Sequence, residues 1–194
     1  KGADVNHAKV GFTPLHQVVR MRTLNIGQFP HPVATGNLTS LDLAKILIDH
    51  GSHVDARTTE GWTDGWRGGF GLDATPFLIA AKGGDAQMMR LLVEKGADVK
   101  ATNRGGTTAI MAAAGVEMFN PNEDSGTDAD GLAALKVAIE LGAGDINAVN
   151  NRGEAALHGA VYRTSTDLIQ YLVDHGARLD LKNKQGRTPL ELAV

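Results

Sequence analysis

The sequence predicts an all-α solenoid of stacked helix pairs with hairpin-like finger loops. Two recurring segments predict it. The first begins at a glycine, as in Gly96-Ala97-Asp98-Val99, and occurs at positions 2, 51, 96, 142 and 176. The second follows each of these and has the form Gly11-Phe12-Thr13-Pro14-Leu15-His16, in full or in part. Five recurrences along one chain indicate a repeat array, in which each unit buries its apolar face against its neighbours.

The inner helix of each pair is predicted from its start and its small residues. Thr13-Pro14, Thr75-Pro76 and Thr188-Pro189 are helix starts, since Thr is a good N-cap and Pro suits the first helical turn. The alanines at 80–81 and 112–114 then allow close packing between neighbouring inner helices. The His residues of this segment, His16 and His158, are expected to make structural hydrogen bonds.

An outer helix follows each inner one. Its signal is a run of apolar residues at helical spacing, ended by a glycine that suits the left-handed backbone conformation. The runs are Leu41, Leu43, Ile46 and Leu47; Met88, Met89, Leu91 and Leu92; Leu132, Leu135, Val137 and Ile139; and Leu168, Ile169, Tyr171 and Leu172. The glycines are Gly51, Gly96, Gly142 and Gly176.

The two segments resemble the ankyrin repeat, which has a Thr-Pro-Leu-His-x-Ala signature and a period of about 33 residues. The resemblance covers nearly the whole chain and implies one array over residues 1–194, with about four full repeats and partial repeats at both ends. The leading glycines lie 49, 45, 46 and 34 residues apart, so three repeats are expected to carry insertions, near 22–38, 62–73 and 116–130. Insertions in the helix turns also resemble those of bacterial ankyrin proteins, some of which are exported.

Composition excludes several classes of protein. The 194 residues contain no Cys, which excludes disulfide scaffolds and a Cys nucleophile, and the net charge of −3 disfavours a globally basic nucleic-acid binder. No sequence motif assembles a nucleophile, base and orienter, so we predict no enzyme, catalytic residue, metal or cofactor. The chain starts at Lys1 and stops at Val194 inside an expected helix, which indicates a fragment of a longer protein.

The insertion at 62–73 contains both Trp residues of the chain. It brings Trp62, Trp66, Arg67 and Phe70 together, residue types that are enriched in binding hot spots. We define these four residues as the aromatic loop and expect it beside the groove. They could instead fold back as a small satellite core, and the two roles are compatible.

The family resemblance implies that fingers and inner-helix tips line a concave groove. Mapped onto this chain, the groove would hold nine basic residues and three clear acids, which predicts a basic groove on an acidic protein. The bases are Lys9, Arg20, Arg67, Lys82, Arg104, Arg152, Arg163, Lys184 and Arg187, and the acids are Glu60, Asp64 and Glu154. Tyr162, Trp62 and Phe12 would add apolar contacts. The alternative is that the bases only confer solubility.

We therefore predict a non-enzymatic module that binds a protein or peptide, with an acidic partner favoured and nucleic acid disfavoured. Two alternatives stay open. One is a binder of a small anionic ligand or nucleic acid in the same groove, and the other is a structural scaffold segment of a longer chain. The sequence predicts neither the compartment nor the oligomeric state.

Overall fold

The computed structural model describes residues 2–8, 11–23, 36–59, 72–118 and 126–193. Within these ranges every regular element is a helix, and no residue lies in a strand. The helices are α1 Pro14–Arg22, α2 Ser40–Asp49, α3 Pro76–Lys82, α4 Ala86–Glu94, α5 Ala109–Ala114, α6 Asp128–Glu140, α7 Ala156–Tyr162, α8 Thr166–Asp174 and α9 Pro189–Leu192. The expectation of an all-α solenoid is confirmed.

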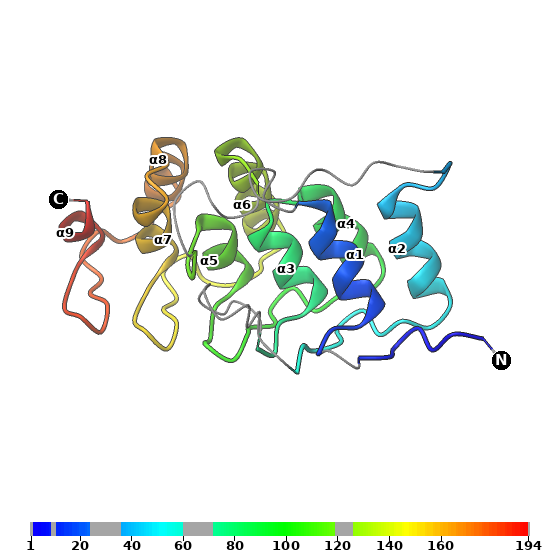
Figure 1. Ribbon diagram of the computed structural model, residues 1–194. Helices are drawn as coiled ribbons and strands as arrows, with labels where there is room; N and C mark the ends of the chain where they lie inside the picture. The colour runs from blue at the N-terminus through cyan, green and yellow to red at the C-terminus, as the bar shows by residue number, and fades with distance from the viewer. Residues whose placement is uncertain (1, 9–10, 24–35, 60–71, 119–125, 194) are drawn as a thin grey trace.

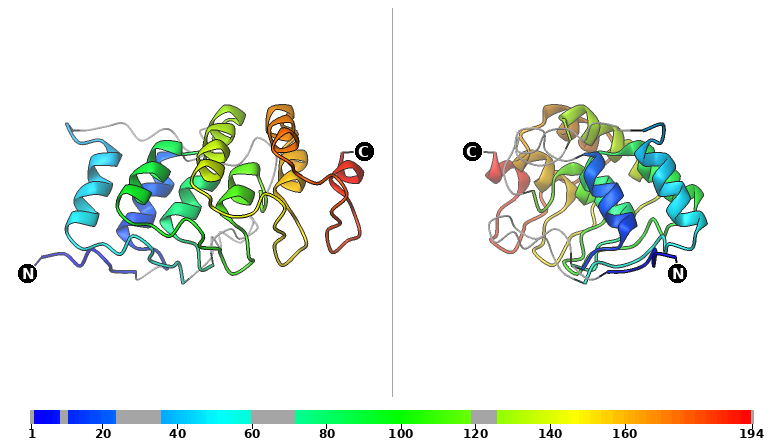
Figure 2. Two further views of the ribbon diagram at one scale, coloured as in Figure 1. Left: turned by 180° about the vertical axis from the view of Figure 1, so that it is seen from behind. Right: turned by 45° about the vertical axis from the view of Figure 1, so that its right-hand side comes forward.

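The helices stand in two rows (Figure 1). The inner row is α1, α3, α5, α7 and α9, and each of these helices packs on the next. The outer row is α2, α4, α6 and α8, and each outer helix packs on the inner helix that precedes it. Turned views show loops projecting from one edge of the stack and the two termini at opposite ends (Figure 2). We call these loops the fingers.

The inner helices begin where the sequence predicts. Thr13, Thr75 and Thr188 are N-caps, and their hydroxyls accept hydrogen bonds from backbone N–H groups in the first turn. In α5 the cap is Thr108, which has no following proline. A side-chain cap satisfies one of the donors that a helix start leaves unpaired, which is why these short helices have defined ends.

Each outer helix ends two residues before its predicted glycine. Gly51, Gly96, Gly142 and Gly176 have φ values of +93°, +92°, +68° and +88°, in the left-handed region that glycine adopts without strain. The core lies between the two rows. Small residues such as Ala80, Ala113 and Ala160 bring the inner helices together, while Met88, Leu135 and other large outer-row residues fill the space behind.

Three fingers have the same hydrogen-bonded tip. A buried asparagine begins each tip, and its side-chain oxygen accepts a backbone N–H from the residue four positions later. The tips are 103–107, 150–154 and 183–187. In each, a glycine one residue before the end has φ of +73° to +77°, which closes the turn. The shared geometry places corresponding side chains at corresponding points on neighbouring fingers.

Backbone hydrogen bonds join one finger to the next. The Arg104 N–H donates to the carbonyl of Leu72 at 3.0 Å, that of Asn151 to Gly105 at 2.8 Å, and that of Lys184 to Arg152 at 2.8 Å. These bonds fix the spacing of the fingers. None of the helices in the described ranges is both long and apolar enough to cross a membrane.

Candidate binding groove

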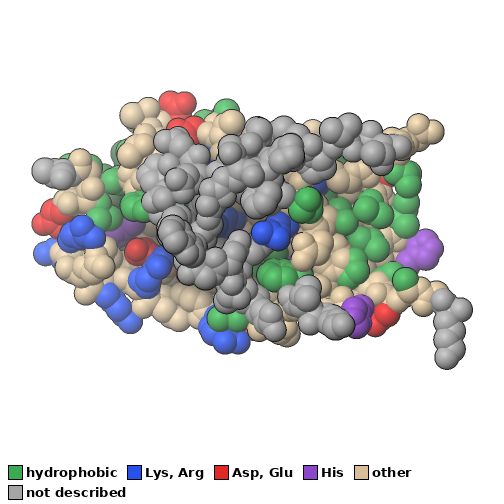
Figure 3. Space-filling model, viewed as in Figure 1, with side chains coloured by type: hydrophobic (Ala, Val, Ile, Leu, Met, Phe, Trp, Pro, Cys, Tyr) green, Lys and Arg blue, Asp and Glu red, His purple; other side chains and the backbone are tan. Residues whose placement is uncertain are grey.

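The aromatic loop lies outside the described residues. Trp62, Trp66, Arg67 and Phe70 belong to 60–71, and Lys9 and the acids Glu60 and Asp64 are likewise outside. Their roles in binding stay predictions. The described part of the groove consists of the inner helices and the fingers. Lys and Arg side chains gather along the finger edge of the molecule (Figure 3).

Several of the predicted basic residues have acidic or carbonyl partners within the protein. Arg104 Nε lies 3.0 Å from Asp73 Oδ2, and Lys82 Nζ donates to the carbonyl of Glu117 at 3.0 Å. Arg20 lies in the last turn of α1, half-buried. The positive charge of Arg104 is therefore offset locally by a carboxylate that the sequence-based count of groove acids omitted.

Arg163 is buried and does not present its charge to the groove. Its side chain is only 5% exposed, Nε lies 2.7 Å from Asp128 Oδ1, and Nη2 donates to the carbonyl of Gly126 at 3.2 Å. It is the C-cap residue of α7, and from there its side chain reaches the start of α6 in the preceding helix pair. Assigning Arg163 to a binding surface is therefore wrong for this conformation, because the guanidinium is used to join two repeats.

A pocket of about 230 Å³ opens between α5, α7, α9 and the fingers. Its apolar wall comes from Val116, Met118 and Leu192, with the ring of Tyr162 beside them. Tyr162 is 45% exposed, and its role in binding stays a prediction. The polar part of the wall comes from Glu117, from His158 and from the tips of two neighbouring fingers, residues 152–154 and 183–187.

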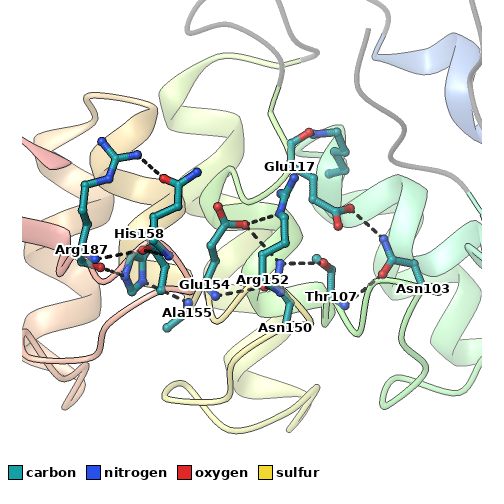
Figure 4. Close-up of polar contacts among 12 residues, drawn as sticks. Asn103, Thr107, Glu117, Asn150, Arg152, Glu154, Ala155, His158 and Arg187 are labelled. Atoms are coloured by element: carbon teal, nitrogen blue, oxygen red, sulfur yellow. Dashed lines mark hydrogen bonds and ion pairs between the residues drawn. The ribbon is translucent and has the colours of Figure 1, made fainter.

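The polar wall is a row of side chains in which charge alternates. Figure 4 shows Arg187, Glu154 and Arg152 rising from the fingers, with Glu117 at the end of the row, where its carboxylate points toward the finger at Asn103. Arg152 Nε donates to Glu154 Oε2 at 2.8 Å, and Glu117 Oε2 accepts from the Asn103 amide at 2.8 Å. Arg152 and Glu154, a base and an acid that the sequence assigned to the groove, thus form an ion pair, so Arg152 is not an isolated base.

Sequence reasoning missed Glu117 as a groove residue. It follows α5 with a φ of +63°, which is uncommon outside glycine, and this backbone turns its carboxylate back toward the finger at Asn103. Its only sequence signal is its place at the start of the 116–130 insertion. Gln185 was also missed, although it occupies the finger position that corresponds to Arg152.

His16 and His158 have the structural role that the sequence predicts. Each ring Nδ1 accepts the backbone N–H of the residue three positions earlier, at 3.1 Å in both cases. Nε2 of His16 contacts the carbonyls of Ala56 and Ala74, and Nε2 of His158 contacts that of Arg187. Burial lowers the pKa of His16 below its ordinary value. Across the described ranges, no cluster of three or more His, Asp or Glu residues is arranged to hold a metal ion.

These features define a class of protein: an all-α repeat solenoid whose fingers and inner helices form a recessed polar surface. A sequence model described as ankyrin repeats (three copies) matches residues 32–120 and 116–194, which is most of the chain. The protein belongs to the ankyrin-repeat family. The Thr-Pro caps, the glycine helix ends and the buried histidines are thus family features observed in this chain.

Individual relatives share part of this array. The chain is 33% identical to bovine (Bos taurus) protein fem-1 homolog A over 119 residues, which is 58% of this chain and 16% of that protein. It is 31% identical to human (Homo sapiens) ankyrin repeat and SOCS box protein 16 over 156 residues, 80% of this chain and 30% of that protein. The chain thus spans less than a third of either relative. Both come from animals, and the resemblance to bacterial proteins stays a prediction.

Proposed function

We propose that this chain is a non-enzymatic module that binds a protein or peptide along the groove between its fingers and inner helices. Ankyrin repeats generally mediate protein–protein interaction, and this chain belongs to that family. The aromatic loop at 62–70 would supply anchor residues beside the groove, because Trp and Arg are the residue types that dominate binding energy in interfaces.

The observation that carries the proposal is the pocket between α5, α7 and the last two finger tips. Its volume of about 230 Å³ suits one side chain better than a whole small-molecule ligand, since ligand sites usually run from about 300 Å³ upward. An exposed aromatic ring, an apolar wall and a charged rim are the components of an anchor site in a protein interface.

The alternating charges favour a protein partner over nucleic acid. A nucleic-acid surface needs many unpaired cations aimed at phosphates, and here Arg104, Arg152 and Arg163 are engaged with carboxylates of the same chain. A small anionic ligand remains the weaker alternative for the same groove, because two glutamates stand beside its arginines.

One observation favours the scaffold alternative. At the N-terminal end of the stack, Met21, Leu43 and Ile46 are 42%, 40% and 39% exposed, and hydrophobic side chains gather on that part of the surface (Figure 3). A repeat or domain packed against this end would bury them. A structural segment of a longer chain would need such an end face, and a groove binder would not.

A pull-down from a lysate of the source organism tests the binding role. Wild type is compared with Trp62→Ala/Trp66→Ala/Arg67→Ala and with Tyr162→Ala in the pocket, after circular dichroism has verified that each variant is folded. The matched control removes three exposed outer-helix side chains by the substitutions Arg90→Ala, Lys136→Ala and Gln170→Ala.

We expect wild type and the outer-helix control to capture the same protein, and both groove variants to lose most of it. Equal capture by all four proteins would refute the groove as the binding site. Capture by none of them, with a partner recovered only when the array is extended at its N-terminal end, would support the scaffold role instead.

A further inference from the structure

The chemistry of the pocket depends on which of its charges are already neutralised. Four charged side chains line it: Glu117, Arg152, Glu154 and Arg187. Arg152 and Glu154 form an ion pair, and Glu117 accepts from Asn103. Within the described residues, the guanidinium of Arg187 bonds to the neutral amide of Gln185, and no carboxylate pairs with it. Of the two arginines among the described pocket residues, Arg187 is therefore the one without a carboxylate partner.

The backbone of Arg187 is also held in place before any partner arrives. Its N–H donates to Asn183 Oδ1 at 3.0 Å, and its carbonyl accepts from the Asn183 N–H at 2.9 Å and contacts His158 Nε2 at 3.2 Å. The guanidinium donates one hydrogen bond, from Nη2 to the side-chain oxygen of Gln185. Fixing the point from which a side chain extends lowers the entropy that binding must offset.

The guanidinium retains donors for a second group. Arginine has five N–H donors in a planar fork, and one nitrogen of Arg187, Nη2, is engaged by Gln185. A planar carboxylate can take two parallel hydrogen bonds from the remaining donors. The neighbouring Tyr162 ring and Leu192 would contact the methylene groups that carry such a carboxylate.

The balance of charge in the pocket decides between anions. A phosphate carries a charge near −2, whereas a side-chain carboxylate carries −1. Two arginines and two glutamates line the pocket, so the second charge of a phosphate gains about as much repulsion as attraction there, while its desolvation costs more than that of a carboxylate. The pocket therefore favours a carboxylate.

We infer that this pocket is a specificity site for one acidic residue, Asp or Glu, of a bound peptide segment, and that Arg187 is the residue that reads it. The inference rests on the proposed peptide-binding function. It goes beyond that function because it assigns the preference for an acid to one arginine rather than to a generally basic groove.

The test begins with a library of random linear peptides displayed on phage and selected on wild type. Binding peptides are then synthesised, and their affinities are measured by fluorescence anisotropy. Each acidic position is changed to its amide, Glu→Gln or Asp→Asn, to find the acid that contributes to affinity. We expect the change at one such position to lower the affinity of the peptide roughly tenfold, as for the loss of a close charge pair.

A double-mutant cycle assigns that acid to its partner. In Arg187→Ala the same peptide change should have almost no effect, and Arg187→Lys should recover only part of the loss because an ammonium lacks the planar fork. Arg90→Ala, which removes an exposed arginine on the outer helix α4, is the matched control and should leave the tenfold effect intact. Glu154→Gln should raise affinity for the acidic peptide, since it removes a negative charge beside the site.

The failures of the two proposals are distinct. Peptides that bind the groove with no acidic position, or with an acid whose effect persists in Arg187→Ala, would overturn the inference and leave the binding function standing. Failure to select any peptide, together with a pull-down that captures nothing, would overturn both. A phosphopeptide that binds more tightly than its Glu counterpart would also overturn the choice of a carboxylate.

Discussion

Gly159 in α7 gives the sharpest test of how closely the inner helices must approach one another. A Cβ atom added at this position would lie 2.4 Å from the backbone nitrogen of Val116 and 2.8 Å from the carbonyl carbon of Gly115. Both are backbone atoms at the end of α5, so no side chain can rotate away to make room. Gly159→Ala must therefore move α5 relative to α7.

Two opposing effects set the size of the change. Alanine in place of glycine inside a helix contributes about 1 kcal/mol of stability. Overpacking a tight site costs about 1–3 kcal/mol, and a backbone contact at 2.4 Å belongs at the upper end of that range. We expect a net loss of about 1–2 kcal/mol in the free energy of unfolding.

Urea unfolding followed by far-UV circular dichroism measures this loss. The matched control is Gly131→Ala in α6, where the nearest atoms to an added Cβ are the Arg163 guanidinium and the Ala113 carbonyl oxygen, at 3.3–3.4 Å. The control should be neutral or more stable than wild type. A gain of stability in Gly159→Ala as well would refute the close approach of α5 and α7 that the pocket depends on.

Two further predictions concern buried polar groups. Asp85→Ala should lower the free energy of unfolding by about 2–4 kcal/mol, because it removes the α4 N-cap bond to the Met88 N–H and leaves the largely buried Arg22 without its carboxylate. The second prediction concerns His16. Because burial lowers the pKa of His16 in the folded protein, the unfolded state binds a proton at a higher pH than the folded state does, beginning near pH 6.5. Stability should then fall by up to about 1.4 kcal/mol per pH unit, measured as urea midpoints from neutral to mildly acidic pH.

Each of these has its own control. Asp49→Ala removes an exposed partner of Lys95 and should change stability by less than about 1 kcal/mol. A loss in Asp85→Ala no larger than that would contradict the buried-pair argument. For pH, His16→Gln should show a shallower acid dependence than wild type, and identical profiles would show that His16 does not set it.

The helical framework was predictable from sequence because its signals are local. Thr-Pro caps, apolar runs and closing glycines each act within a few residues, so the starts of α1, α3 and α9 could be named in advance. The polar row of the groove was less accessible. Whether Arg163 reaches Asp128, or Arg104 reaches Asp73, depends on contacts between repeats. A count of charges by repeat position misses such ion pairs, because it treats every charged side chain as exposed to solvent.

The recurring finger tip contains a signal that could have been used. An asparagine followed three residues later by glycine occurs at 103, 150 and 183, and aligning these three tips places Gln185 beside Arg152 in register, and Arg187 beside Glu154. That alignment predicts the neighbours across the pocket. It does not predict Glu117, because the backbone conformation of that residue is set by the chain that leaves α5 rather than by the repeat.

The backbone bonds that link successive fingers also determine how the array can bend. Lys184 N–H to Arg152 carbonyl and Asn151 N–H to Gly105 carbonyl act as pivots along one edge, whereas the outer helices contact each other only through side chains. Small rotations between repeats would therefore increase the distance between neighbouring outer helices, while the distance between neighbouring fingers stays the same. Because the pocket lies at that pinned edge, its width should stay nearly constant when the protein is bent or stretched.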